Sequence, residues 1–365
     1  MHPTVLLGLL AFIYSPPASA TADMVPDIAY QVGRMSILPP AAEQRPRTRL
    51  EELVVLPSPG PLAVPLGVPA EAPPRDVWER IRKRFAMPEL TGPVVERQEA
   101  SFLKRPDVLK GILQRSRRYL YHVVNELERR NFPMELALLP IVESGYNPHA
   151  LSSAQASGLW QFIPHTGKRY ELAQTDSYDA RRDIVASTRA ALDYLQFLYS
   201  LLGDWHLALA SYNWGEQAVL GAVERNRSKG RPTNYESLTL PEETRLYVPK
   251  LQALRNIIAN PEAFGVKLDP LPNEPYFMAV DNTRNLDLRT AAKLAEMPLD
   301  EFLALNPAFN GSVISAADTS SILLPVDQVE IFRRNVQNLR PNQTPRTRVP
   351  VTRSLVSTVS APSPN

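Results

Sequence analysis

Cysteine is absent from all 365 residues of the chain. Without a thiol, the protein forms no disulfide, builds no zinc-thiolate site and has no cysteine nucleophile. It also offers no cysteine that could accept the lipid of a bacterial lipoprotein. We therefore expect its chemistry to come from oxygen and nitrogen groups.

Histidine and excess charge are also scarce. The net charge is +2, which gives no basic stripe for duplex DNA, and no glycine-rich phosphate loop follows a predicted strand. The 5 histidines show no metal-ligand spacing; they are His2, His122, His149, His165 and His206. We therefore expect no metal, no cofactor and no nucleic-acid partner.

A membrane-spanning run of apolar residues is missing as well. Residues 5–13 are apolar but too few to cross a bilayer as a helix. Pro16 and Pro17 and then the small residues 18–20 follow, which is typical of a signal peptidase site. We predict a signal peptide over residues 1–20 and a periplasmic protein of the bacterial cell envelope. If this segment stayed uncleaved, it would tether the chain to the inner membrane.

Proline, in contrast, is abundant and unevenly distributed. Ten of the 36 prolines fall within residues 39–74, and little periodicity accompanies them. This composition predicts a disordered, proline-rich linker over residues 21–75. Proline, serine and threonine are again enriched near the C-terminus, where we predict a disordered tail over residues 341–365.

Helical periodicity dominates the middle of the chain. Apolar residues recur at three and four positions in segments 77–85, 107–130, 154–172, 183–202, 204–214 and 216–226. Asp183 and Asp204 are placed as N-caps. Segment 183–202 is apolar enough to be a central core helix. Its apolar residues include Leu192, Leu195, Phe197, Leu198 and Leu201. A mainly α body is predicted over residues 76–265, with its core at 120–230.

A further helix follows Pro133, which suits a first helical turn, and ends at Gly145. This helix carries Glu143 at its C-terminal end. A glutamate at such a position is ordinarily exposed to water, so the neighbouring motifs must decide whether Glu143 is functional.

The sequence pattern changes after residue 260. Prolines at 270–275 form a linker, and a strand (276–280), two helices (287–296 and 299–306) and a second strand (321–325) are predicted after it. This order over residues 275–332 resembles a degenerate LysM carbohydrate-binding module, including Asn306 after the second helix. The alternative is a small docking subdomain of the helical body.

Three segments carry residues suited to glycan chemistry. Glu143 ends the apolar run 137–143, Gln161 follows eighteen residues later within the aromatic segment 156–164, and Tyr212 and Asn213 lie in segment 209–215. A carboxyl group can protonate a glycosidic oxygen, and amide and aromatic side chains bind sugars. The combination indicates cleavage of a glycan.

With segments 133–144, 158–162, 178–183 and 243–251, these motifs resemble those of the lytic murein transglycosylases of the lysozyme-like superfamily, of the membrane-bound D type. The resemblance covers roughly residues 97–332. It implies a mainly α, lysozyme-like (soluble-lytic-transglycosylase-type) catalytic domain with a small α+β, LysM-like C-terminal subdomain. The implied activity is that of a lyase that cuts the MurNAc-β-1,4-GlcNAc bond of peptidoglycan glycan strands without a cofactor.

The resemblance also implies roles for individual residues. Glu143 would protonate the glycosidic oxygen and then, as a base, take the proton of the sugar's own C6 hydroxyl, which closes a 1,6-anhydro ring. For this its pKa must be raised by an apolar setting, which residues 138–142 and Trp160 could supply. The implied substrate-binding residues are Ser152, Gln161, Tyr212, Asn213 and Glu243.

Some of these residues could instead have purely structural roles. Ser152 could serve only a local turn, Tyr212 could be a core aromatic, and Glu243 could pair with Arg245. The chain also departs from the family pattern at Gln155, Ser211 and Trp214. If position 155 needs a positive φ, Gln155 would cost about 1 kcal/mol of strain.

Two alternatives to a transglycosylase stay open. One is a peptidoglycan-binding or scaffolding protein whose turnover is lost, which the three departures would favour. The other is a lysozyme-type muramidase, a hydrolase that needs a second carboxylate across from Glu143, for which Asp176 or Asp179 are candidates. In each case we expect a monomer that acts on peptidoglycan.

Overall fold

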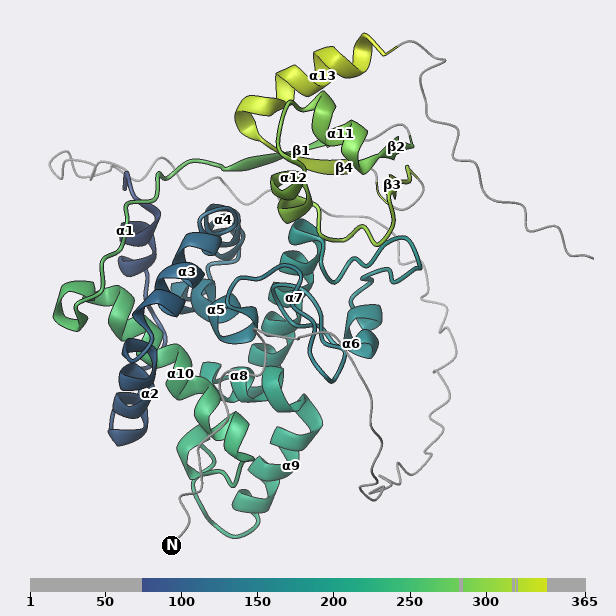
Figure 1. The fold of residues 1–365 in the computed structure, drawn as a ribbon. Helices are drawn as coiled ribbons and strands as arrows, with labels where there is room; N and C mark the ends of the chain where they lie inside the picture. The colour runs from purple at the N-terminus through teal and green to yellow at the C-terminus, as the bar shows by residue number, and fades with distance from the viewer. Residues whose placement is uncertain (1–73, 282–284, 317–318, 320, 340–365) are drawn as a thin grey trace, which may run out of the picture. The chain divides into compact units, whose positions relative to one another are not determined.

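The computed structural model describes residues 74–281, 285–316, 319 and 321–339. The predicted signal peptide, nearly all of the proline-rich linker and the predicted tail lie outside the described residues. The described part is mainly helical, and its few strands belong to a small unit at its C-terminal end (Figure 1).

The elements follow one another in this order. The helices of the body are α1 (Val77–Arg82), α2 (Pro93–Leu103), α3 (Pro106–Ser116), α4 (Leu120–Arg129), α5 (Leu139–Ser144), α6 (Pro164–Arg169), α7 (Ile184–Leu202), α8 (Trp205–Trp214), α9 (Glu216–Arg227) and α10 (Glu242–Ala259). Short 3-10 helices lie at Met134–Leu138, Tyr235–Ser237 and Pro261–Phe264. The C-terminal module contains β1 (Phe277–Asp281), β2 (Leu286–Asp287), α11 (Leu288–Leu294), α12 (Leu299–Leu305), β3 (Val313–Ile314), β4 (Ser321–Pro325), the 3-10 helix Val326–Gln328 and α13 (Val329–Gln337).

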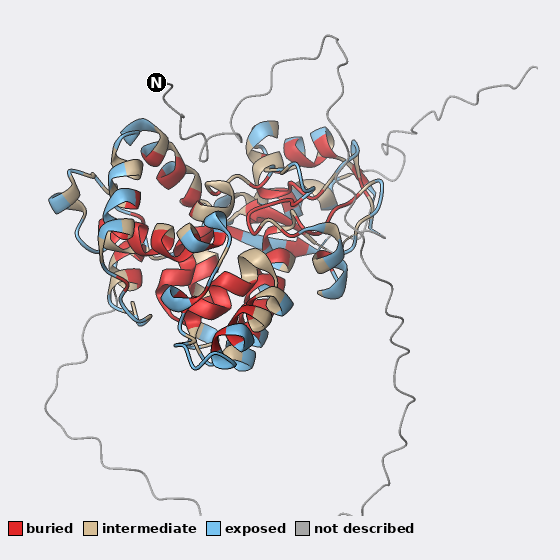
Figure 2. Cartoon of the chain, turned by 90° about the horizontal axis from the view of Figure 1, so that it is seen from below, coloured by how far each residue is buried: buried red, intermediate tan, exposed pale blue. Residues whose placement is uncertain are grey.

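The predicted core helix is confirmed as α7, which packs against α8 and α4. Asp183 and Asp204 cap α7 and α8 as predicted, by accepting from Ala186 N at 2.7 Å and Leu207 N at 2.8 Å. Figure 2 shows buried residues gathered on the central helices of the body. Only part of the predicted apolar set is buried, however. Phe197 and Leu201 are 38% and 42% exposed, because α7 turns these two side chains away from the helices that it contacts.

Two predicted helices are wrong in extent. The segment 107–130 is divided between α3 and α4, because Arg117 N and Tyr119 N bond to carbonyls only three residues back and so close α3 in a tight turn. The segment 154–172 is mostly a loop, and only α6 is helical in it. Its bridges pair Ser157 with both Leu151 and Phe162, so the backbone folds back on itself instead of coiling.

Helix α10 was not predicted, although it packs against α2, α8 and the 3-10 helix Met134–Leu138. Pro249 lies inside it and removes one helical N–H donor, which makes the segment look like a poor helix former. Burial compensates for that loss: Tyr247, Leu251 and Leu254 are each at most 3% exposed. Tertiary packing therefore forms a helix that local preference disfavours.

The predicted strand–helix–helix–strand order of the C-terminal module is confirmed. Strands β1 and β4 pair antiparallel, with Ala279 opposite Leu323, and α11 and α12 lie between them in the chain (Figure 1). The sequence did not reveal the short antiparallel pair β2–β3 or α13. The module has an apolar cluster of its own, which includes Phe302, Ile314 and Phe332.

The module also contacts the body through specific bonds. Arg118 at the end of α3 binds both carboxylate oxygens of Glu301, and Tyr119 donates its hydroxyl to the carbonyl of Ala304 at 2.8 Å. Phe277 and Leu323 of the module join the apolar core of the body. The LysM-like order and the docking contacts therefore occur together in one unit.

No helix within the described residues is long and apolar enough to cross a membrane.

Asn306 ties α12 to β4 and provides a test of the module's packing. Its buried side chain donates to the carbonyls of Phe302 and Leu323 and accepts from Leu323 N, at 2.8–2.9 Å. The substitution Asn306→Ala leaves both backbone groups of Leu323 without this partner, so we expect it to lower the free energy of unfolding by about 2 kcal/mol or more. Urea unfolding of the full chain measures this loss.

The matched control is Asn338→Ala, at an exposed asparagine just after α13. We expect its free energy of unfolding to stay within about 0.5 kcal/mol of the wild type. Equal effects of the two substitutions would contradict the role of Asn306.

Candidate active site

Glu143 lies one residue before the end of α5, where the chain turns sharply. Gly145 caps the helix in the left-handed conformation, with φ 58°. A Cβ at this position would lie 3.2 Å from Arg115 Nη2 and 3.3 Å from Ile112 Cγ1, so a side chain here would meet both conformational strain and crowding. Arg115 Nε also donates to the Gly145 carbonyl at 3.0 Å. The predicted C-cap is confirmed, and it fixes the direction in which Glu143 leaves the helix.

The surroundings of Glu143 favour its protonated form. The side chain is only partly exposed, and burial raises the pKa of its carboxyl group from the ordinary 4.5 to about 7. The phenol of Tyr247 donates to Glu143 Oε1 and partly opposes that rise, because it stabilises the carboxylate. The raised pKa agrees with the sequence-based expectation for an acid in an apolar setting.

Two further charged groups act on Glu143 from α10. The charge of Glu243 raises the pKa of Glu143, and the cation of Lys250 lowers it. Glu243, Tyr247 and Lys250 are spaced by four and three residues and therefore share one face of α10. Burial lowers the pKa of the Lys250 ammonium group, which lies on this face beside the two carboxylates.

Sequence reasoning missed Tyr247. Segment 243–251 contributed to the family resemblance, yet a tyrosine inside a predicted core segment does not stand out as a functional residue. Tyr247 is 3% exposed, and burial followed by the charge of Glu143 raises the pKa of its phenol. It is therefore a neutral donor when Glu143 is ionised. The sequence offered one indication of its role: Tyr247 lies four residues after Glu243 and would share a helix face with it.

Tyr212 and Asn213 reach the site from the end of α8. Tyr212 donates its hydroxyl to the Trp160 carbonyl at 2.8 Å, and its pKa is raised by burial and then by the charge of Glu143. Asn213 donates to Glu243 Oε1 at 3.3 Å and accepts from Thr244 Oγ1 at 2.7 Å. These bonds join the end of α8 to the first turn of α10.

Glu243 therefore has Asn213 as its partner. Among the described residues, no ion pair joins Glu243 to Arg245. The side chain of Glu243 is exposed. Glu243 lies one turn before Tyr247 on α10, the helix whose tyrosine bonds to Glu143, and its charge raises the pKa of Glu143.

Ser152 and Gln161 lie in the loop 150–162, which takes the place of the first part of the predicted helix 154–172. Ser152 Oγ accepts from Ala156 N at 2.9 Å, which is the local turn role that the sequence left open. Gln161 donates its side-chain amide to the carbonyls of Gly158 at 2.8 Å and Ala150 at 3.3 Å. Both side chains thus stabilise the loop itself. No other described residue bonds to the Ser152 hydroxyl proton or to the Gln161 side-chain oxygen.

The loop is held directly against the helix that carries Glu143. Ser144, the next residue, donates its hydroxyl to the Leu159 carbonyl at 2.9 Å. Trp160 is fully buried and donates its indole N–H to Thr188 Oγ1 at 3.0 Å on α7. The bond from Ser144 to the loop gives this neighbour of Glu143 a structural role.

The two aspartates considered as second carboxylates are placed differently. Asp179 is buried and binds Arg181 through both oxygens, at 3.0 and 2.7 Å. Asp176 is exposed. Neither influences the pKa of Glu143, whereas Glu243 does. Of the three acidic residues compared, Glu243 is thus the one whose charge raises the pKa of Glu143.

No group of three or more histidine, aspartate or glutamate side chains able to hold a metal ion occurs in the described part of the chain. The arrangement does supply a carboxyl group that can change protonation near neutral pH, a phenol bonded to it and a loop with unused polar atoms. Such a group can serve as an acid in one step and as a base in the next.

Comparison with known proteins gives two matching family models. Residues 123–234 match the Transglycosylase SLT domain, and residues 276–340 match the LysM-like domain of lytic transglycosylase MltD. The lysozyme-like fold class of the body and the LysM-like character of the module are therefore confirmed.

Individual relatives agree with these matches. The chain is 36% identical over 266 residues, 73% of its length, to membrane-bound lytic murein transglycosylase D of Escherichia coli (strain K12). It is 42% identical over 126 residues, 34% of its length, to a putative tributyltin chloride resistance protein of Alteromonas sp. (strain M-1), and covers 61% of that protein. The chain spans 59% of the length of the Escherichia coli relative.

The raised pKa of Glu143 makes the stability of the protein depend on pH. Because the folded-state pKa of about 7 exceeds the ordinary 4.5, Glu143 favours folding most below about pH 4.5, and that contribution is lost as pH rises through 7. At pH 8 the buried carboxylate costs about 3 kcal/mol. We expect Glu143→Gln to unfold with a free energy higher than wild type by about this amount at pH 8, and by little at pH 4.5. Urea unfolding at both pH values checks this, and a pH-independent difference would contradict it.

The bond from Tyr247 gives a second expected pKa change. Tyr247→Phe removes a donor that stabilises the carboxylate, so the pKa of Glu143 should rise above about 7. The measurement is a carbon-13 NMR titration of labelled glutamate carboxyl groups. Tyr235→Phe is the matched control, because Tyr235 donates instead to the Thr244 carbonyl at 2.8 Å. A pKa that is unchanged or lower in Tyr247→Phe would refute the assignment.

Proposed function

Because the chain carries a transglycosylase SLT domain followed by the LysM-like domain of lytic transglycosylase MltD, we propose that it is a peptidoglycan lytic transglycosylase. The observation that supports this most directly is the pKa of about 7 of Glu143, in the segment that the SLT family covers. The proposed reaction cleaves the MurNAc-β-1,4-GlcNAc bond and leaves a 1,6-anhydro-MurNAc end.

In the first step the Glu143 carboxyl group gives its proton to the glycosidic oxygen. The bond between MurNAc C1 and that oxygen breaks, its electron pair leaves with the GlcNAc hydroxyl, and the positive charge at C1 is stabilised by the neighbouring N-acetyl oxygen. In the second step the Glu143 carboxylate takes the proton of the MurNAc C6 hydroxyl, and O6 bonds to C1. Glu143 ends protonated, and no water is consumed.

A pKa near 7 suits both halves of this cycle. The carboxyl group is protonated often enough to act as the acid, and it is basic enough to accept a proton afterwards. Tyr247 stabilises the intermediate carboxylate through its hydroxyl group. One titrating group in two roles replaces the two carboxylates of most glycosidases.

The other site residues contribute binding in this proposal. The free acceptor of Gln161 and the hydroxyl proton of Ser152 would bind the acetamido and hydroxyl groups of the sugars. Tyr212 would hold the loop against the acid through its bond to the Trp160 carbonyl. Asn213 and Glu243 would line the same site from the junction of α8 and α10.

We further propose that residues 76–265, with a core at 120–230, form the catalytic domain, and that residues 275–332 form a LysM-like subdomain docked to it. The protein would work as a periplasmic monomer on peptidoglycan glycan strands. No cofactor enters the proposed cycle, in which every proton transfer goes through Glu143.

Two alternatives follow from specific observations. Glu243 is a second carboxylate that acts on Glu143, which a hydrolase would need. Ser211, one of the departures from the family pattern, has a buried hydroxyl without a hydrogen-bond partner among the described residues, and such a change next to Tyr212 is what a binding protein with lost turnover could tolerate.

Mass analysis of peptidoglycan sacculi after incubation with the purified protein separates the three functions. We expect 1,6-anhydro-muropeptides from the wild type and a rate lower by about 10²–10⁴-fold for Glu143→Gln. The control Glu242→Gln, at an exposed glutamate in the first turn of α10, should keep the normal rate. Reducing-end products would indicate a hydrolase. Binding to sacculi without any product would indicate a scaffolding protein.

A further inference from the structure

The loop that carries Ser152 and Gln161 contains two strained backbone positions. Gln155 and Gln161 have φ values of 60° and 50°, in the left-handed region that side chains with a Cβ disfavour. Each position costs on the order of 1 kcal/mol. Position 155 therefore has the positive φ on which the expected strain of Gln155 depended. Such strain persists only where neighbouring groups hold the backbone in place.

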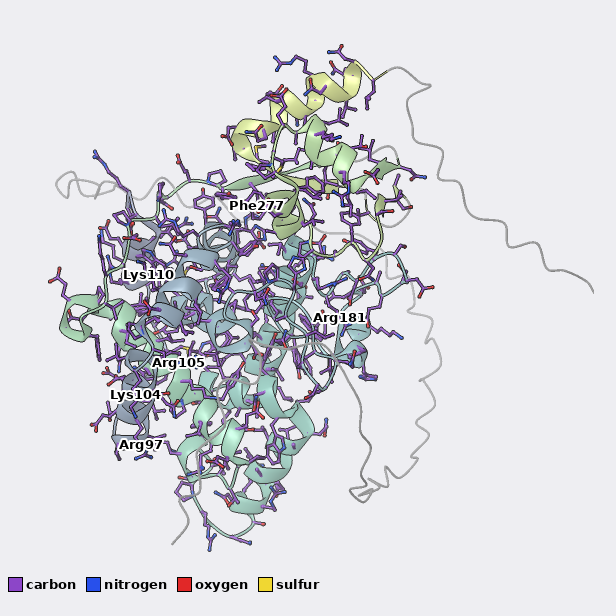
Figure 3. The ribbon with its side chains drawn as sticks, viewed as in Figure 1. Arg97, Lys104, Arg105, Lys110, Arg181 and Phe277 are labelled. Carbon is purple, nitrogen blue, oxygen red and sulfur yellow. The ribbon has the colours of Figure 1, made fainter. Side chains whose placement is uncertain are left out.

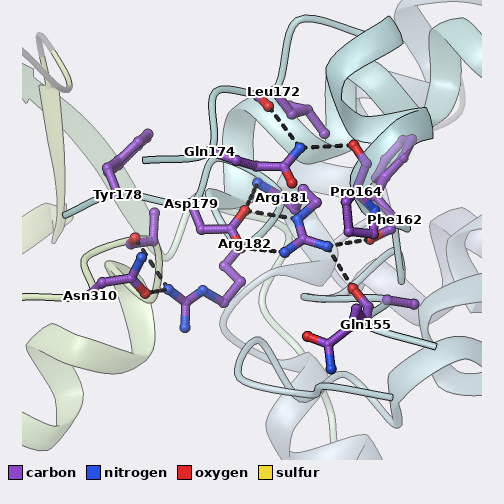
Figure 4. A network of polar contacts seen from close by, with 12 residues as sticks. Gln155, Phe162, Pro164, Leu172, Gln174, Tyr178, Asp179, Arg181, Arg182 and Asn310 are labelled. Atoms are coloured by element: carbon purple, nitrogen blue, oxygen red, sulfur yellow. Dashed lines mark hydrogen bonds and ion pairs between the residues drawn. The ribbon is translucent and has the colours of Figure 1, made fainter. Parts of the chain in front are cut away.

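One guanidinium group bonds to the first strained residue and to the residue that follows the second. Arg181 Nη1 donates to the Gln155 carbonyl at 2.6 Å and to the Phe162 carbonyl, one residue after Gln161, at 3.1 Å (Figure 4). The Phe162 carbonyl also accepts from Ser157 N at 3.1 Å, which closes the loop on itself. Arg181 thus joins the two ends of the segment 155–162.

The orientation of this guanidinium is itself fixed. Its Nε and Nη2 atoms donate to the two carboxylate oxygens of Asp179, at 3.0 and 2.7 Å (Figure 4). The Arg181 side chain is buried, with 7% of its surface exposed. By comparison, an exposed group of basic side chains lies on or beside α2 and α3, far from Arg181 (Figure 3): Arg97, Lys104, Arg105 and Lys110. A bidentate, buried pair of this kind holds a planar group with little freedom.

The backbone of Arg181 also shapes the loop. A Cβ on Gly158, which has φ 83°, would lie 2.3 Å from the Arg181 carbonyl oxygen. The two backbone segments are therefore in contact, and only glycine fits at position 158. The loop meets Arg181 through its side chain at two places and through its main chain at a third.

The C-terminal module supports the base of this arrangement. Asp179 N donates to the Ala308 carbonyl at 2.8 Å, and Asn310 N donates to the Ser177 carbonyl at 2.8 Å. Arg182 bonds to Asn310 Oδ1 in the same junction (Figure 4). The segment that presents Asp179 and Arg181 is therefore held between the loop and the module.

We propose that Arg181 is a positioning residue for glycan binding, which holds Gln155 and Phe162 so that Ser152 and Gln161 face the substrate. This rests on the proposed function, since it assigns the loop to sugar binding. Arg181 bonds to the loop at Gln155 and Phe162, whereas the loop meets the elements around Glu143 through the carbonyls of Leu159 and Trp160. Because Leu159 and Trp160 are buried in the apolar core, we expect them to keep their places without Arg181, so the acid keeps its surroundings.

The test uses the full chain and the substitution Arg181→Lys. Lysine keeps the charge beside Asp179 but lacks the planar fork that reaches two carbonyls and a carboxylate together. Arg189→Lys is the matched control, at an exposed arginine of α7 that bonds to neither the loop nor Asp179 among the described residues. The second variant is Gln155→Gly, which removes the strain at position 155 without touching a site residue.

Two measurements are compared for every variant. The first is the dissociation constant for chitotetraose, measured by calorimetry in the Glu143→Gln background, where turnover cannot interfere. The second is KM and kcat on soluble glycan strands, together with Tm and the pH profile. For Arg181→Lys we expect the dissociation constant and KM to rise about tenfold or more, with the pH profile of kcat unchanged.

The combination Arg181→Lys with Gln155→Gly should recover most of the lost affinity, because glycine adopts the left-handed conformation without the bond from Arg181. Gln155→Gly alone and Arg189→Lys should bind like the wild type. A purely structural role would instead lower Tm and activity in parallel, without rescue by Gln155→Gly, and that result would overturn the inference.

Failure of the inference is distinguishable from failure of the proposed function. If the wild type releases anhydro-products but Arg181→Lys binds glycan normally, only the inference is wrong. If the wild type neither binds chitotetraose nor releases products, the proposed function fails, and the role of Arg181 in glycan binding fails with it.

Discussion

The burial of one carboxyl group, Glu143, is the constraint on which the rest of the site depends. Its pKa of about 7 exists because protein atoms replace water around it, and water would return if α5, α8, α10 and the loop 150–162 were not held together. Each of these elements is tied to another by a specific bond: Ser144 to Leu159, Tyr212 to Trp160, Asn213 to Glu243, and Tyr247 to Glu143 itself. The bonds are modest individually, but together they exclude solvent from one side of the carboxyl group.

The elements around Glu143 must be held rigidly to keep water away from its carboxyl group. The chain holds them in two ways. The helices around Glu143 are anchored in a continuous apolar core to which Leu192 and Leu254 belong. The loop enters this core only near its C-terminal end, through Leu159, Trp160 and Phe162, and polar groups hold the rest, with Arg181 and Asp179 at its base. The strained residues Gln155 and Gln161 lie on either side of the segment that enters the core, close to the carbonyls to which Arg181 donates.

The C-terminal module combines two features that the sequence presented as alternatives. It matches the LysM-like family model, and it is bonded to the body through Glu301, Ala304 and Ala308. Docking brings the module to the segment that contains Asp179, next to the loop of the candidate site. The LysM-like module therefore has a supporting role in the structure of its neighbour.

The sequence by itself determined the mainly α class, the capped helices α7 and α8, the strand order of the module and the position of Glu143. These features depend on local patterns: apolar periodicity, N-capping aspartates, a glycine after a helix and a motif of fixed spacing. Tertiary structure decided the rest. The loop 150–162 reads as a helix because its apolar residues recur at helical spacing, yet contacts with Arg181 hold residues 155 and 161 in left-handed conformations. Tyr247 acts on Glu143 across 104 residues of sequence, and α10 forms in spite of Pro249, because both depend on which surfaces meet when the chain folds.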